Sequence, residues 1–369
     1  MASVNDMLLD ASIQHSIDLA KYENHLVRRM MAVLNRSDDR LFSELTTALE
    51  RMDPASFTVE RLESLLGSVR SVNAQAYAQV GEELRQELRD FVDYEVSYQR
   101  QALVSVLPVS VHVASLSADT VYAAALARPF QGVLLKGVLA DVEAGKAKRI
   151  RQAVAQGFTE GKTADAIIRE IRGRKANGYA DGLMEASRRD TAAIVRTALG
   201  HMAGFVQDRT TEANTDIIKA VQWSSHLDMR TTPICRLRDG KLYDPETHKP
   251  IGHSAPWLSG PGRSHWCCRS AQVYVLKSYK ELGIDIPEVV VKGKTRASLD
   301  GQVAADKSYG QWLQEQSFAR QSEVLGPTRA KLMRDGKLPL DAMYSQKGEY
   351  LDLLQLREKA ASAFKKAGI

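Results

Sequence analysis

The chain has 369 residues, of which 44% are hydrophobic and 26% are charged, a composition that excludes wholesale disorder. Only 7% are aromatic, while Leu, Ala, Arg and Glu are frequent, which favours a mostly helical chain over an all-β one. The net charge of +5 is the sum of −6 over residues 1–100 and +11 over residues 101–369. This split is compatible with one part that faces protein and another that faces a polyanion, although no dense basic cluster indicates specific nucleic-acid binding.

The cysteines and the apolar segments restrict the cellular setting. Three cysteines are too few for the disulfide framework of a secreted protein, and the first residues lack a basic segment followed by an apolar run. The most apolar stretch, residues 103–140, is interrupted by prolines and charged residues, so no run in it approaches the ~20 residues of a membrane span. We expect a protein kept in a reducing compartment, without a membrane.

Residues 1–100 are predicted to form helices. Leucines and a valine recur with helical spacing at Leu62, Leu65, Leu66 and Val69, and Thr58 precedes them as a capping residue. From Tyr77 to Phe91 apolar residues recur at near-heptad spacing. This second pattern indicates a long amphipathic helix, packed within the molecule or used as an assembly surface, and we favour packing within the molecule.

The next segment changes pattern several times. Alternation at Val109, Val111 and Val113 predicts a short strand within residues 104–113. Helical periodicity then covers residues 133–155, a segment that starts at Thr163, and residues 188–209. The run Gly157–Thr163 resembles a phosphate-binding loop, but it has one residue too few between its glycines and follows a helix rather than a strand. A helix–helix turn capped by Thr163 explains it better.

The most informative region is a long loop between two short predicted strands. Alternation at Val221 and Trp223 predicts the first strand, and Ala271, Val273 and Val275 predict the second. Residues 231–263 between them are rich in Pro, Gly and Asp. An irregular connection of this length is uncommon in a compact domain unless it is functional or held internally.

The fold class expected from these patterns is α+β, predominantly α-helical. We expect a helical N-terminal region (1–100), a connecting segment with a short strand and a helix (101–149), and a small α/β core domain with a long pinned loop (150–276). A basic linker (277–305) and a C-terminal helical module (306–369) complete the predicted division.

All three cysteines fall in the loop region, at Cys235, Cys267 and Cys268, with His265 beside the last two. Two thiolates and an imidazole could hold a structural zinc ion, with Cys235, His265 and Cys268 as the ligands. No Cys-x-x-Cys pair is present, however, and side chains of adjacent cysteines tend to diverge. The alternatives are that Cys235 and Cys268 pack as small buried residues, or that a Cys–His pair acts as a nucleophile.

A second polar group lies near the end of the first predicted strand. Asp228 at a strand end can accept backbone N–H bonds, and Arg230 two residues later can bridge to the loop. Trp223 would anchor the strand in the core. Together with the thiols and the imidazole, these residues predict that the loop from Asp228 to Ser270 is a structural clasp, whose contacts offset the cost of ordering a loop poor in apolar side chains.

These residues also carry a family resemblance. The order Arg196-Thr197 on a helix, then Trp223, Asp228, Arg230, Thr231 and Cys235, then a turn at Gly240, and finally His265, Cys268 and Arg269 resembles the phage Mu F-like head morphogenesis, or minor capsid, family. The resemblance covers about residues 150–275. Residues 309–337 resemble a tail often attached to such proteins. Two positions depart from the family pattern: Trp266 stands in place of Pro, and Ser270 replaces the last Cys, which removes one potential metal ligand.

The resemblance implies a minor head protein of the virion, made in the host bacterial cytoplasm and not an enzyme. Its implied place is the head interior or the portal vertex, with the portal protein and the major capsid protein as partners. Non-specific contact with packaged double-stranded DNA and ejection with that DNA are further expectations, and no membrane partner is expected in the mature particle. The alternative function is a metal-dependent hydrolase or nuclease that uses the Cys/His loop 226–268.

Overall fold

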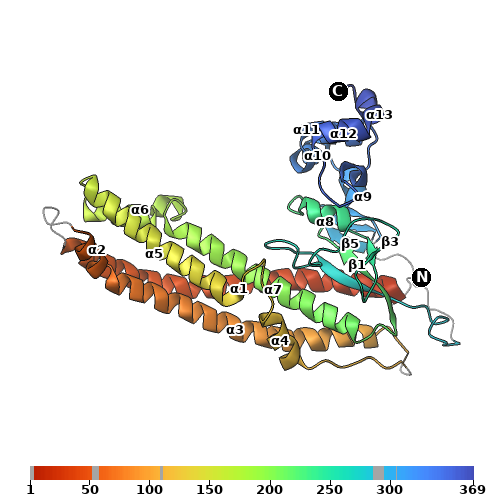
Figure 1. Cartoon of the computed structure of the whole chain (residues 1–369), viewed down its shortest axis with the longest axis horizontal. Coiled ribbons are helices and arrows are strands. Elements are labelled where there is room, and N and C mark those ends of the chain that lie inside the picture. The colour runs from red at the N-terminus through yellow and green to blue at the C-terminus, as the bar shows by residue number, and fades with distance from the viewer. Residues whose placement is uncertain (1–3, 52–57, 109–110, 286–294, 305) are drawn as a thin grey trace. The chain divides into compact units, whose positions relative to one another are not determined.

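The computed structural model describes residues 4–51, 58–108, 111–285, 295–304 and 306–369 (Figure 1). The protein is 61% helical and contains one small antiparallel four-stranded sheet, which confirms the predicted α+β, predominantly helical class. Contacts divide the chain into two compact units. Unit 1 comprises Met1–Ala20, Asp93–Val121 and Ala203–Ile369, and unit 2 comprises Lys21–Val92 and Tyr122–Met202. The five-segment division remains a prediction about domain boundaries.

Three long helices contribute residues to both units. They are α1 (Val4–Glu50), α3 (Gly67–Val104) and α7 (Met184–Glu212). The near-heptad residues of α3 from Tyr77 to Phe91 are all buried, with at most 4% exposure. This pattern therefore serves packing within the molecule, as we favoured. On α7 the apolar residues of the predicted helix over residues 188–209, namely Ile194, Ala198, Met202 and Phe205, are buried as well.

Unit 2 adds shorter helices to these long ones. They are α2 (Val59–Leu65), α4 (Ala118–Leu126, shared with unit 1), α5 (Leu135–Thr159), α6 (Ala164–Arg172) and the 3₁₀ turn η2 (Lys175–Asn177). One apolar core joins α1, α2, α3, α5 and α6, with Leu45, Leu62, Val154 and Ile167 at most 1% exposed. The spacing of Leu62, Leu65, Leu66 and Val69 predicts one shared helix, but the structure divides them: α2 ends at Leu65, Leu66 lies in a turn, and α3 begins at Gly67.

The turn between α5 and α6 has the predicted character. Thr163 caps α6, and its Oγ1 accepts a hydrogen bond from the backbone N–H of Ala166 at 3.3 Å. Gly157 lies where α6 approaches α5 closely, so that a Cβ at this position would overlap the side chain of Ile167. The glycine is thus explained by helix packing and the threonine by capping.

Unit 1 is built around the sheet, whose strand order is β3-β2-β1-β4. The strands are β1 (Ile218–Ser224), β2 (Leu242–Tyr243), β3 (Pro250–Ile251) and β4 (Ala271–Leu276), all antiparallel to their neighbours. The two strands predicted at the ends of the long loop are therefore adjacent. At the edge strand β4, the side chain of Asn5 pairs with both the N–H (2.7 Å) and the carbonyl (3.4 Å) of Leu276, which satisfies backbone groups that a sheet edge leaves open.

The C-terminal part of unit 1 consists of a small hairpin and short helices. The hairpin pairs β5 (Thr295–Ser298) with β6 (Gly301–Ala304). The helices that follow are α9 (Tyr309–Gln314), α10 (Phe318–Leu325), α11 (Pro327–Arg334), η3 (Leu340–Met343), α12 (Leu353–Lys359) and α13 (Ala361–Ala367). They share one apolar core with Leu227, Leu237 and Ala255 of the long loop.

One predicted element is wrong within the described residues. In place of a strand over residues 104–113, α3 continues to Val104 and a turn follows to Pro108. Residues 109 and 110 lie outside the described residues, and 111–113 have no strand partner. The alternating valines do not need a strand, because Val113 is buried at 3% exposure in the apolar core beneath the sheet.

A buried ion triad in unit 2 generates a test of the fold. Asp38 on α1 is 4% exposed and binds Lys146 of α5 at 3.0 Å and Arg188 of α7 at 2.6 Å. We expect Asp38→Ala to lower the free energy of unfolding by about 3–5 kcal/mol, because it leaves two cations without their buried counter-charge. Asp39→Ala, the exposed neighbour, is the matched control and should change it by less than about 0.5 kcal/mol. Urea unfolding measures both, and equal shifts would contradict the role of the triad.

Candidate metal centre

The long loop between β1 and β4 contains a short helix that carries the first cysteine. Thr232 precedes α8 (Pro233–Arg238), and Pro233 at the first helical position fits the helix start. The helix is followed by Gly240 with a φ of 79°, a left-handed turn that favours glycine. The N–H of Gly240 then donates to the carbonyl of Trp223 at 2.8 Å, which returns the chain to β1 and explains the glycine of the motif.

The structure brings the three candidate ligands together. The Sγ atoms of Cys235 and Cys268 are 3.7 Å apart, and Nε2 of His265 is 3.2 Å from Sγ of Cys235. Ligand atoms of all three lie within 4.8 Å of one another. Both cysteines are 2% exposed. The adjacent Cys267 has a φ of 54°. At this turn in the backbone the Cys268 thiol joins the cluster, and the Cys267 thiol does not.

The geometry fits a tetrahedral zinc ion. Zinc–sulfur bonds of ~2.3 Å in tetrahedral geometry place two sulfurs ~3.8 Å apart, close to the spacing of Cys235 and Cys268. Nδ1 of His265 lies 2.9 Å from the carbonyl oxygen of Trp266, so the network assigns the proton to Nδ1. A metal-ligating histidine commonly donates its other ring N–H in this way. The lone pair of Nε2 then faces Oγ1 of Thr232 at 2.9 Å and Sγ of Cys235 at 3.2 Å, and a bound ion would replace the hydrogen bond from the Thr232 hydroxyl.

Protonation within the cluster is set by close contact. The hydrogen bond from the Cys235 thiol, together with His265, lowers the pKa of Cys268 although burial opposes this. The same hydrogen bond and burial raise the pKa of Cys235. Burial opposes protonation of His265, but its contact with Cys268 raises its pKa overall. The cluster thus favours a thiolate on Cys268, the form in which cysteine binds metal.

The position of the missing family cysteine lies beside this cluster. Ser270 is 8% exposed, and its Oγ is 3.1 Å from Oγ of Ser225. The chain therefore offers two thiols and one imidazole as ligands. A cysteine at position 270 would add a third thiol beside them. Trp266, the other departure from the family pattern, is 45% exposed.

Asp228 is held by a partner other than the expected one. Its carboxylate accepts two hydrogen bonds from the guanidinium of Arg269, at 2.7 and 2.8 Å, and one from the backbone N–H of Arg230 at 3.0 Å. The Arg230 side chain is 83% exposed and reaches Asp228 only at 4.0 Å. Burial alone would raise the pKa of Asp228, but Arg269 holds it below its usual value. Arg269, directly after Cys268, is thus the residue that bridges to the loop.

The remaining predicted residues have local structural roles. Trp223 is fully buried in β1, edge-on to Trp257 with ring centroids 5.5 Å apart. The hydroxyl of Thr231 donates to the carbonyl of His226 at 2.6 Å. Arg196 and Thr197 lie on the part of α7 that belongs to unit 2, where Thr197 is buried.

The other histidines of the loop region do not join the cluster. His248 stacks on Trp257 with ring centroids 4.6 Å apart, and Nε2 of His253 donates to the carbonyl of Leu242 at 2.8 Å. Burial lowers the pKa of His226 to about 4, so this imidazole is neutral at neutral pH.

A second polar centre, which the sequence analysis missed, holds the loop from the other side. Asp239 has a fully buried side chain and binds the guanidinium of Arg296 from β5 with two contacts of 3.1 Å. It also accepts the N–H of Ser225 and the N–H of Tyr309, both at 2.7 Å. In the sequence, Gly240 indicates only a turn, and Arg296 falls in the predicted basic linker 277–305. No periodic pattern could have paired Asp239 with Arg296.

Comparison with known proteins agrees with the motif order. The family model described as Phage Mu protein F like protein matches residues 148–273, which confirms the resemblance over this stretch. No curated protein and no solved structure matches the chain. Within the described residues, no helix is both long and apolar enough to cross a membrane. A Mu F-like domain suggests a phage head morphogenesis protein with a structural role and a place in the virion.

Metal analysis of the purified protein tests the candidate centre. Because Cys235, His265 and Cys268 fit zinc, we expect about one zinc per chain, and we expect His265→Ala to lose it and to lower the melting temperature. Cys267→Ser is the matched control, since it removes a neighbouring thiol outside the cluster, and it should keep the metal. Ser270→Cys should tighten zinc binding by adding a fourth ligand. If the protein contains no metal after incubation with zinc, and chelators do not change its melting temperature, the cysteines are packed thiols and not metal ligands.

Proposed function

We propose that this chain is a bacteriophage minor head protein that acts in head morphogenesis. The observation that carries the proposal is the Mu F-like match over residues 148–273. Contacts of motif residues in the loop support a structural role, since Gly240 hydrogen-bonds Trp223 of β1 and Arg269 binds Asp228. Made in the bacterial cytoplasm, the protein would join the head at or near the portal vertex, with the portal protein and the major capsid protein as its partners.

Burial of the candidate metal centre supports a structural role over a catalytic one. Both sulfurs belong to side chains that are 2% exposed, so a bound ion would be largely closed to a substrate. The alternative, a metal-dependent hydrolase or nuclease, is favoured by one observation: three ligands leave a fourth coordination position open, as in catalytic zinc sites. A catalytic centre predicts that His265→Ala gives a folded, inactive protein, whereas a structural centre predicts a destabilised one.

Charge supports contact with packaged DNA as part of this function. Residues 101–369 carry a net charge of +11, against −6 for residues 1–100. A basic portion of this size attracts a polyanion through phosphate contacts, without reading its sequence. The acidic, helical N-terminal segment would then face virion proteins. Because the basic portion would lie next to the packaged DNA, the protein would be ejected together with that DNA.

The protein composition of purified phage particles tests the proposal directly. We expect quantitative mass spectrometry to find the chain in mature heads at a small fraction of the copy number of the shell subunit, because a protein bound at or near one vertex is limited by the sites there. Particles of a phage mutant that lacks the gene provide the control. Absence from particles, or a copy number equal to that of the shell protein, would contradict the proposal.

DNA binding by the free protein tests the polyanion contact. We expect weak binding that falls by about tenfold or more between 50 and 200 mM salt, because only counterion release drives it. Gel-shift titrations with two unrelated duplexes of equal length measure this, and both should bind alike. A complex that is specific for one sequence and insensitive to salt would show that the charge split has another meaning.

A further inference from the structure

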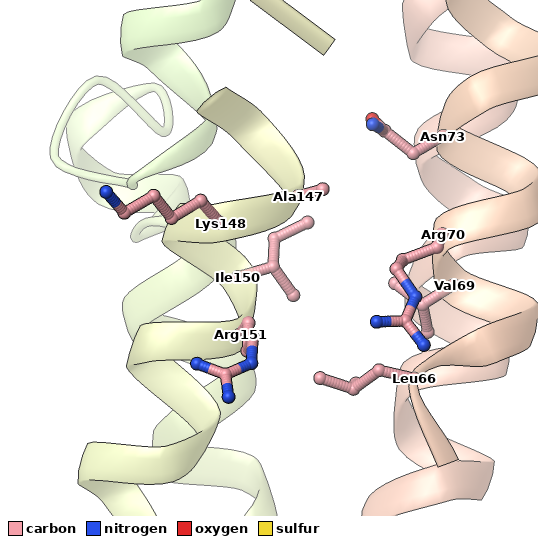
Figure 2. Close-up of a pocket in the computed structure, with 8 residues that line it drawn as sticks. All are labelled: Leu66, Val69, Arg70, Asn73, Ala147, Lys148, Ile150 and Arg151. Atoms are coloured by element: carbon pink, nitrogen blue, oxygen red, sulfur yellow. The ribbon is translucent and has the colours of Figure 1, made fainter. Parts of the chain in front are cut away.

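In unit 2, α3 and α5 enclose two neighbouring cavities. One has a volume of about 200 Å³ and is lined by Leu66 directly before α3, by residues between Val69 and Asn73 on α3, and by residues between Ala147 and Arg151 on α5 (Figure 2). The other, of about 320 Å³, is lined by residues between Ala74 and Arg85 on α3 and between Lys136 and Glu143 on α5. The two cavities follow each other along the same helix pair. With a rise of ~1.5 Å per residue, their centres are roughly 14 Å apart.

The cavities have apolar surfaces and polar rims. In the smaller one, the side chains of Leu66, directly before α3, and of Ile150 on α5 both extend into the space between the two helices (Figure 2). The larger one is lined by small residues, among them Ala74, Ala78 and Gly81. Each cavity has room for one or two apolar side chains. Removing such side chains from water would supply the main favourable energy of an association here.

Charge around the cavities is cationic, although residues 1–100 are acidic as a whole. Five cationic side chains line them, those of Arg70, Arg85, Lys136, Lys148 and Arg151, against one lining carboxylate, that of Glu143. Arg85 also pairs with Glu82. Arg70 and Arg151 share the single carboxylate of Glu63. Lys136 is exposed and has no partner among the described residues. The local excess of positive charge fits an acidic partner.

A buried polar atom lies between the two cavities. Asn73 is 1% exposed, and its Nδ2 donates to the carbonyl (3.1 Å) and to Oε1 (2.7 Å) of Glu143. Its Oδ1 is buried without a hydrogen-bond partner among the described residues. Such an atom costs free energy until a donor reaches it. A side-chain N–H or O–H of an occupant could supply that donor, because the backbone N–H groups of a bound helix are already used within the helix.

We propose that the two cavities together form a groove along α3 and α5 that docks an acidic amphipathic helix of a partner protein. The helix has apolar anchors two to three turns apart, one for each cavity, a polar donor between them that reaches Asn73, and carboxylates beside the anchors. This is the helix-in-groove mode of recognition, in which apolar anchors give affinity and rim charges give specificity. The groove lies mostly outside the Mu F-like match of residues 148–273, so it does not depend on the proposed function.

Peptide binding to the full-length protein tests the groove. The probe is a synthetic helical peptide with leucines at i, i+7 and i+11, one glutamine between them, and glutamates on the flanks. We expect fluorescence anisotropy to detect saturable binding, at least about tenfold tighter than for the same peptide with serine in place of leucine. A version with lysine in place of glutamate should also bind more weakly.

Two matched pairs of variants locate the binding. Ala78→Phe fills the larger cavity from an exposed position and should weaken binding about tenfold, whereas Gln79→Phe, exposed and outside the lining, should not. Lys136→Glu should weaken binding, whereas Lys175→Glu on η2 should not. Absence of saturable binding, equal binding of the lysine peptide, or equal effects within either pair would overturn the proposal. So would sedimentation data in which Ala78→Phe dissociates a dimer, since a second copy of the chain would then occupy the groove.

Discussion

A single buried carboxylate connects the parts of unit 1. Asp239 has a fully buried side chain and receives two N–H groups of Arg296 and the backbone N–H groups of Ser225 and Tyr309. These donors come from the end of β1, from β5 and from the start of α9. Charge-assisted bonds to a desolvated carboxylate are strong, and the loss of one partner leaves the other charge buried and costs about 3–5 kcal/mol.

This centre changes the account of how the long loop is held. The sequence offered only the thiols, His265 and the Asp228/Arg230 pair as a clasp. The structure adds the C-terminal helices, which cover the loop with a shared core that includes Leu237, Tyr309 and Trp312. The guanidinium of Arg236 also donates to the carbonyl of Val324 at 2.9 Å. A metal at the cysteines would therefore be one of several constraints on the loop, and its removal should loosen the loop rather than unfold the unit.

The sequence predicted those features that depend on local pattern. Helical spacing identified the buried face of α7, capping chemistry identified Thr163, and alternation identified β1 and β4. It failed where the partner is distant in sequence. Arg269 instead of Arg230 binds Asp228 because β4 runs back beside β1 and brings residue 269 to the end of that strand. Arg296 looked like part of a basic linker because its counter-charge lies 57 residues away. The valines near residue 110 alternate as in a strand, but no neighbouring strand is available to pair with them within the described residues.

Several motif residues also hold the fold in this region. Trp223, Thr231, Gly240 and Arg269 each make a contact that fixes the loop on the sheet. Their contacts explain why the Mu F-like pattern is spread over so many residues. A structural clasp needs many separate contacts at fixed places along the chain.

Hydrogen exchange of the Asp239→Ala variant tests this account most directly. Our account predicts that amides of the loop between β1 and β4 and of the C-terminal helices lose protection together, while those of unit 2 remain as in the wild type. Asp341→Ala removes an exposed ion pair with Lys241 at the same junction and should change little. Unchanged protection in Asp239→Ala, or a loss confined to the C-terminal helices, would contradict the claim that this carboxylate holds the loop.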